Sequence, residues 1–163
     1  MTAVAAVVGW IVWQMRPSVV LAKRHAALID GIERRSPARI SRLVAKGYSD
    51  RWGFSCEDLV ATMIDGGSQF LVLTVETEDL ETAIDGDRAE ISFRMLLGGT
   101  PVGPAGGGVL RQINQLGSPF VFTWEKQSFL PSSWRLVRVE NAALPDDLYG
   151  YEPGDLKRAI RGE

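Results

Sequence analysis

The only histidine of the chain, His25, is the residue best suited to proton transfer, because an unperturbed imidazole titrates near neutral pH. It lies four residues from both Leu21 and Ile29, on the apolar side of an expected helix. A histidine in that position is usually a packing residue held by a hydrogen bond. The sequence therefore predicts no catalytic residue.

Cys56 is the only cysteine, so no disulfide can form within the chain and no cysteine-based metal site exists. A single histidine cannot supply the ligand spacing of a metal site either. The position of Cys56 at the start of an expected helix could lower the pKa of its thiol. A lone cysteine without a nearby base is more often a packed small residue. No metal ligand is predicted.

Two further stretches have the composition of a binding site without its arrangement. Asp85 and Asp87 flank Gly86, and paired carboxylates can bind a cation or exchange a proton. Aspartates in a turn usually accept hydrogen bonds from their own backbone instead. The glycine-rich residues 98–108 lack the residue order of a phosphate-binding loop. We expect a flexible loop there, over the mouth of a pocket, with no regular element through residues 106–108, and no cofactor.

Five aromatic residues and one arginine are the candidates for lining a ligand pocket: Trp52, Phe54, Phe93, Phe122, Trp124 and Arg138. Core packing explains the aromatic residues equally well. Arg138 and Glu140 share one face of an expected strand. Arg138 is therefore either an inward cation that holds an anionic ligand or one half of a surface ion pair.

Three helices are expected before any strand. The spacing of apolar residues predicts helices over residues 19–34, from Pro37 to about Gly47, and after Ser55. Ser55 and Asp58 have the spacing of a capping box, which marks the start of the third helix.

Two hairpins are expected to follow the helices. Residues 70–97 alternate as two long strands, and Asp85-Gly86 is a strong turn signal between them. The apolar residues of the first strand change from odd to even positions within residues 76–79, and one extra residue there, a β-bulge, would keep them on one face. Residues 120–141 form the second hairpin, with Phe122 and Trp124 on one face.

Three helices, a long bent hairpin and a final hairpin ending in Trp-Arg-Leu-Val-Arg-Val resemble the NTF2-like superfamily. The resemblance rests on residues 28–48, 85–89 and 122–139, and covers about residues 19–144. It implies an α+β fold in which three N-terminal helices pack on a strongly curved, mainly antiparallel sheet, an NTF2-like or cystatin-like cone with a pocket. It also implies that a homodimer could form through the sheet face.

Members of this superfamily include ketosteroid isomerase-like enzymes, dehydratases, polyketide cyclases and non-catalytic binding domains. Fold alone does not choose among them. No residue of this chain matches the catalytic residues of the enzymes, so none is carried over.

Residues 1–18 are predicted to be an apolar membrane anchor or signal-like segment. Residues 2–15 carry no charge, and Trp10 and Trp13 suit a membrane interface. A helix of this length reaches only about 20 Å, so it would have to continue past Arg16 to cross a ~30 Å hydrocarbon core. A signal peptide and a buried helix are the alternatives. The side of the membrane stays open.

The net charge and its distribution along the chain indicate which kinds of binding partner to expect. A formal net charge of −2 gives no reason to expect nucleic acid. Residues 16–51 are basic and residues 56–90 acidic, which fits either solvated surfaces or a membrane-facing surface.

Residues 145–163 are rich in Asp, Gly and Pro and are expected to be a mobile tail with one helical turn at residues 156–160.

Together these patterns predict a membrane-anchored, non-catalytic NTF2-like domain over residues 19–144 that binds a small apolar ligand or a protein partner. The alternative is a small cofactor-independent enzyme of the isomerase, dehydratase or cyclase type with a hydrophobic cone.

Overall fold

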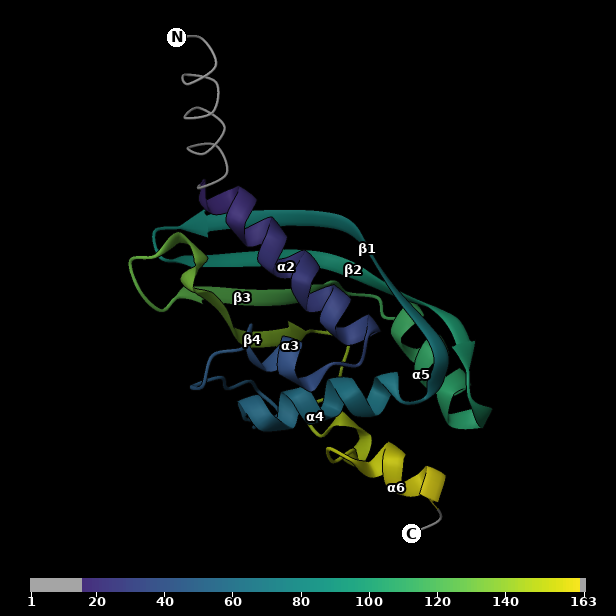
Figure 1. The fold of residues 1–163 in the computed structure, drawn as a ribbon. Coiled ribbons are helices and arrows are strands. Elements are labelled where there is room, and N and C mark those ends of the chain that lie inside the picture. Colours follow the sequence, from purple (N-terminus) through teal and green to yellow (C-terminus); the bar gives the residue numbers. More distant parts are fainter. Residues whose placement is uncertain (1–15, 162–163) are drawn as a thin grey trace, which may run out of the picture.

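An antiparallel four-stranded sheet is the frame of the computed structural model, which describes residues 16–161 (Figure 1). Across the sheet the strands follow the chain: β1 (Phe70–Asp85), β2 (Arg88–Pro101), β3 (Phe120–Lys126) and β4 (Trp134–Asn141). Only the first part of β2, residues 88–93, pairs with β3. The far halves of β1 and β2 therefore extend past β3 as a bent two-stranded arm (Figure 1).

The bend of β1 contains the bulge that the sequence predicts. The register between β1 and β2 shifts between Glu78 and Glu81, and Asp79 has a φ of 52°. The turn at the end of this hairpin also lies where it is predicted, because Asp85 pairs with Arg88 and Gly86 has a φ of 56°. Glycine adopts that left-handed conformation without strain.

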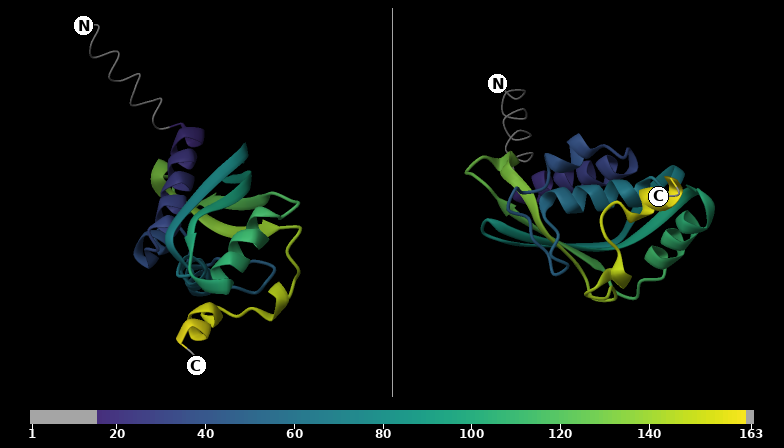
Figure 2. Two further views of the ribbon diagram at one scale, coloured as in Figure 1. Left: turned by 90° about the vertical axis from the view of Figure 1, so that its right-hand side faces the viewer. Right: turned by 90° about the horizontal axis from the view of Figure 1, so that it is seen from below.

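Three helices precede the sheet, as predicted: α2 (Pro17–Glu33), α3 (Pro37–Ser41) and α4 (Cys56–Gly67). They cover one face of the sheet, and the sheet curves around them (Figures 1 and 2). The predicted capping box is present at the start of α4. The Asp58 amide donates to Ser55 Oγ at 3.2 Å, and the Ser55 amide donates to Asp58 Oδ2 at 2.9 Å.

Helix α3 ends earlier than predicted, at Ser41 rather than near Gly47. The chain leaves the helix because it pairs with β4 instead. The Leu136 amide donates to the Leu43 carbonyl at 2.8 Å, and the Ala45 amide donates to the Leu136 carbonyl at 2.9 Å. Tertiary hydrogen bonding thus replaces the helical pattern that the sequence suggests.

The main core lies between α2 and the sheet. Inward-facing aromatic residues of β2, β3 and β4 meet the apolar stripe of α2, and its largest fully buried side chains are Phe93, Phe122, Trp124, Trp134, Leu21 and Leu28. Phe93 and Phe122 pack edge to face with ring centroids 4.8 Å apart. Each buried ring contributes roughly 2–3 kcal/mol through the apolar surface it removes from water.

The prediction that no regular element passes through residues 106–108 is wrong. Helix α5 (Gly103–Asn114) runs through them. A Cβ on Gly106 would lie 2.3 Å from the Gln69 carbonyl oxygen and 3.0 Å from Pro101 Cβ, so glycine permits a close approach of the helix to β2. At the C-terminal end of α5, the Asn114 side chain makes two hydrogen bonds to the backbone of Leu97. The Leu97 amide donates to Asn114 Oδ1 at 2.7 Å, and Asn114 Nδ2 donates to the Leu97 carbonyl at 2.9 Å.

The C-terminal segment contains the short helices η2 (Leu148–Gly150) and α6 (Asp155–Arg161). Its composition suggested a mobile tail with one helical turn. In the structure it crosses beneath α4, and α6 packs on α4 (Figure 1).

The predicted N-terminal anchor falls almost entirely outside the described residues, and Pro17 and Ser18 already belong to α2. Within residues 16–161, none of the helices has the length and apolar character needed to cross a bilayer.

Candidate ligand cavity

An apolar cavity of about 590 Å³ lies between the bent arm of the sheet, α4, α5 and the C-terminal segment. Its volume falls within the roughly 300–1,000 Å³ of small-molecule sites. The sheet contributes Phe70, Leu73, Met95, Leu97, Phe120, Phe122 and Val139, while α4 contributes Leu59, Thr62 and Met63, and α5 contributes Val109, Gln112 and Ile113. The bend of β1 and β2 and the close approach of α5 together create this space.

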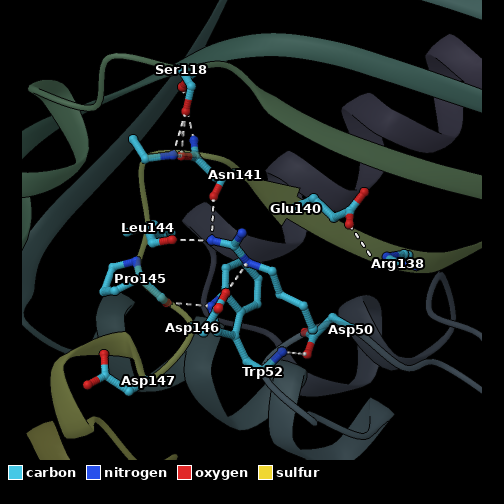
Figure 3. Close-up of polar contacts among 12 residues, drawn as sticks. Asp50, Trp52, Ser118, Arg138, Glu140, Asn141, Leu144, Pro145, Asp146 and Asp147 are labelled. Atoms are coloured by element: carbon cyan, nitrogen blue, oxygen red, sulfur yellow. Dashed lines mark hydrogen bonds and ion pairs between the residues drawn. The ribbon is translucent and has the colours of Figure 1, made fainter.

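The candidate pocket residues divide into three groups. Trp52, Phe54 and Phe122 line the cavity. Phe93 and Trp124 are fully buried in the core between α2 and the sheet and do not reach it. Arg138 is half exposed on β4 and forms an ion pair with Glu140 at 2.7 Å (Figure 3).

Asp50 positions the two aromatic residues of the connector between α3 and α4. Its Oδ1 accepts hydrogen bonds from the amides of Trp52 and Phe54, both at 3.0 Å. Its Oδ2 accepts from the Tyr48 hydroxyl at 2.7 Å. Burial, reinforced by Asp50, raises the pKa of Tyr48, so the hydroxyl stays protonated and remains a donor. The Asp50 carboxylate thus holds this turn beside the cavity through three hydrogen bonds.

Asp65, a fully buried carboxylate on α4, joins this helix to the C-terminal segment. Its Oδ2 accepts from the Tyr151 hydroxyl at 2.9 Å and from the Leu156 amide at 3.0 Å, and its Oδ1 accepts from the Lys157 amide at 2.8 Å. Two of these donors are free amides in the first turn of α6, so Asp65 caps a helix remote in sequence. Burial, with a contribution from Asp65, raises the pKa of Tyr151.

Arg51 and Trp52 hold the beginning of the C-terminal segment, and Figure 3 shows Trp52 beside Pro145. Trp52 Nε1 donates to the Pro145 carbonyl at 2.9 Å. Arg51 donates to the carbonyls of Asn141, at 2.9 Å, and Leu144. The segment held in this way contributes Leu144, Leu148, Tyr149, Tyr151 and Leu156 to the cavity wall. The C-terminal residues are therefore part of the site.

The sequence interpretation did not identify Asp65 or the C-terminal segment as parts of this site. Asp65 follows the apolar stripe of α4 directly, and an acid that close to a buried face is a weak signal of a buried partner. Its partners lie 86 to 92 residues later in the chain, and local spacing carries no information about them.

His25 lies outside the cavity and packs between α2 and the sheet. Its ring centroid is 4.7 Å from that of Phe93 and 5.8 Å from that of Phe122. It is a packing residue, as the helical pattern suggests, but among the residues that the structure describes neither ring nitrogen has a hydrogen-bond partner. Burial lowers the pKa of His25 to about 4, so its imidazole is neutral at physiological pH.

Neither of the other reactive candidates gains a catalytic environment. Burial, and secondarily Glu57, raises the pKa of the Cys56 thiol, the opposite of what a helix start could produce. Asp87 forms an ion pair with Lys126 at 3.1 Å. In the part of the chain that the structure describes, histidine, cysteine and carboxylate side chains form no group that could hold a metal ion.

No family model and no curated protein sequence matches this chain, but its structure resembles many solved ones. A conserved protein from Planctomyces limnophilus matches 76% of this chain and 93% of its own, with a TM-score of 0.57 and 14% identity. An NTF2-like protein from Cytophaga hutchinsonii matches 74% of this chain and 92% of its own, with a TM-score of 0.51 and 12% identity.

The fold is NTF2-like. The resemblance drawn from the helices and hairpins is confirmed to this extent, since helices pack on a four-stranded antiparallel sheet. The same fold occurs within a larger protein, Bd1075 of Bdellovibrio bacteriovorus, with a TM-score of 0.54 and 10% identity over 75% of this chain. This chain spans only 40% of Bd1075. At such low identities the likeness concerns the fold alone.

Proposed function

We propose that this protein is a membrane-tethered, non-catalytic NTF2-like domain that binds a small apolar ligand in the cavity between the bent sheet, α4, α5 and the C-terminal segment. The observation that carries the proposal is the cavity itself: about 590 Å³, walled mainly by aliphatic and aromatic side chains. A ligand of matching size would gain affinity mainly by leaving water.

The polar groups around the cavity favour binding over catalysis. The Asp50 carboxylate is occupied by two amides and a hydroxyl, and the Asp65 carboxylate by a hydroxyl and two amides. Each carboxylate thus has three structural partners, whereas a general base has to lie within hydrogen-bond reach of the substrate proton. His25 is not among the residues that line this cavity, and its ring packs against Phe93. These arrangements argue against the enzymatic alternative.

The tether is supported by the sequence that precedes α2. Residues 2–15 are uncharged, and they lead into Arg16 at the start of that helix. The first turns of α2 lie at the opposite end of the molecule from α6 (Figure 1). A membrane at this end would leave the cavity side of the domain accessible to a ligand.

Binding of an apolar fluorescent probe, N-phenyl-1-naphthylamine, tests the ligand-binding proposal. We expect saturable enhancement of its fluorescence by the protein. Ile113→Trp places a large ring in the cavity and should abolish this signal. The matched control is Gln115→Trp, at an exposed position just after α5, which should leave binding unchanged. Equal binding by both variants would contradict the proposed site.

A further inference from the structure

The loop between β3 and β4 carries two adjacent apolar side chains in water. Phe129 is 92% exposed and Leu130 is 51% exposed. A phenylalanine at the tip of a loop has no packing role within the domain, and paired exposed apolar residues are typical of an interaction site. The loop therefore presents a small apolar tip, defined here as Phe129 and Leu130.

The exposure of this tip is built into the loop. Ser133 is buried beneath it, and its Oγ lies 2.7 Å from the carbonyl oxygens of both Ser128 and Leu130. The Ser133 amide also donates to the Leu130 carbonyl at 3.0 Å, within the short helix η1 (Pro131–Ser133). These bonds hold the loop in a shape that directs Phe129 outward.

The loop lies beside the first turns of α2 in the views of both Figure 1 and Figure 2. Arg24 on α2 donates a hydrogen bond to the Ser132 carbonyl, which fixes the loop to this helix. The chain enters α2 from the uncharged residues 2–15 at the same end of the domain. The apolar tip therefore lies beside the start of α2, the helix that the proposed tether precedes in the chain.

Two cations lie behind the tip. Arg24 and Arg135 both donate to the Ser132 carbonyl, the latter at 3.1 Å. Burial lowers the pKa of Arg24, and the nearby positive charge of Arg135 lowers it further. Within residues 16–161, neither guanidinium forms an ion pair with a carboxylate. Glu125 lies opposite Arg135 on β3 but pairs with Arg88 at 3.4 Å. An apolar tip backed by two such arginines matches the interface of a membrane that contains anionic lipids.

We infer that Phe129 and Leu130 insert into the interfacial layer of the membrane that holds the N-terminal segment, with Arg24 and Arg135 facing anionic lipid headgroups. This inference rests on the proposed tether and adds a second contact to it. Two contacts would fix the orientation of the domain on the bilayer, whereas a single attachment point would not.

Site-directed fluorescence on the full chain tests the inference. The native cysteine is replaced (Cys56→Ser), and Phe129→Cys carries an environment-sensitive fluorophore. The matched control places the same label at Val102→Cys, an exposed position directly after β2, at the end of this strand away from the β1–β2 turn. Both proteins are mixed with vesicles of phosphatidylcholine and phosphatidylserine and separated by flotation. We expect both to float with the vesicles, and a several-fold, blue-shifted increase in emission only from position 129.

Three results would overturn the inference, and they are distinguishable. If the protein floats and the label at position 129 stays in water, the tether stands and the loop contact is wrong. If the protein does not float, the tether fails and the loop contact with it. If the label at position 129 is shielded before vesicles are added, a second copy of the chain covers the tip. Unchanged thermal unfolding of both labelled variants would show that the fold is intact.

Discussion

The carboxylate of Asp65 accepts a hydrogen bond from the hydroxyl of Tyr151, 2.9 Å away and 86 residues later in the chain. Together with the amides of Leu156 and Lys157, this contact attaches the C-terminal wall of the cavity to α4. The wall and the helix should therefore lose stability together when the carboxylate is altered.

Asp65→Asn keeps the shape of the side chain but removes its charge and leaves one oxygen for three donors. We expect a loss of about 1–3 kcal/mol in the free energy of unfolding, because a buried donor without a partner is costly. Chemical denaturation measures this loss. Glu57→Gln, at an exposed site on the same helix, is the control and should change stability by less than about 0.5 kcal/mol. Equal effects of the two substitutions would contradict the role of Asp65.

His25 should make stability depend on pH. Its pKa is lowered from 6.5 to about 4 in the folded protein, so the unfolded chain binds more protons between these values. The contribution of His25 is complete above pH 6.5 and is lost as the pH falls toward 4, by up to about 3 kcal/mol. His25→Phe removes the titrating group. The difference in unfolding free energy between the two proteins should therefore change across this window, and parallel pH profiles would refute the prediction.

Two glycines of α5 should respond to alanine in opposite ways. Gly106→Ala places a methyl group 2.3 Å from the Gln69 carbonyl oxygen and should destabilise the protein by about 1–3 kcal/mol. Gly108 has open space at the corresponding position. Gly108→Ala should therefore be neutral or stabilise by up to about 1 kcal/mol, because alanine favours the helix. Thermal unfolding of both variants measures the contrast, and a harmless Gly106→Ala would contradict the close packing.

Arg138→Ala should have little effect on either stability or probe binding. The ion pair of Arg138 with Glu140 is half exposed, and such pairs contribute less than about 1 kcal/mol. The side chain lies outside the cavity lining. A large loss of affinity for an apolar probe in this variant would instead favour an arginine that reaches the ligand, one of the two roles its strand pattern allowed.

Local patterns in the sequence predict those elements whose causes are local. The capping box at Ser55, the bulge near Asp79 and the turn at Gly86 each depend on residues within one turn or one strand. The alternation through Phe122 and Trp124 places both side chains on the inner face of β3. It cannot tell which of the two reaches the cavity, because that depends on where α2 ends and the sheet bends.

The remaining features depend on contacts between distant segments. Three consecutive glycines suggest a loop, yet α5 runs through them, and the close approach of Gly106 to Gln69 and Pro101 leaves no room for a side chain. The hydrogen bonds of Asp65 to the C-terminal segment are equally invisible to local spacing. The cavity depends on both, which is why Trp52, Phe54 and Phe122 could be proposed from sequence while the walls contributed by α5 and the C-terminal segment could not.

The hydrogen bonds between residues 43–45 and β4 also bear on how copies of this chain avoid one another. An unpaired strand at the border of a sheet can template pairing with another chain. At the β4 border, the Leu136 amide and carbonyl are already hydrogen-bonded to the Leu43 carbonyl and the Ala45 amide. On the other, the Glu33 carboxylate accepts from the Val75 amide at 2.8 Å, and Arg35 donates to the Phe70 carbonyl at 2.7 Å. Backbone and side chains of the helical region thus cover part of each border, so strand addition from a second copy should be hindered at Leu136 and along residues 70–75.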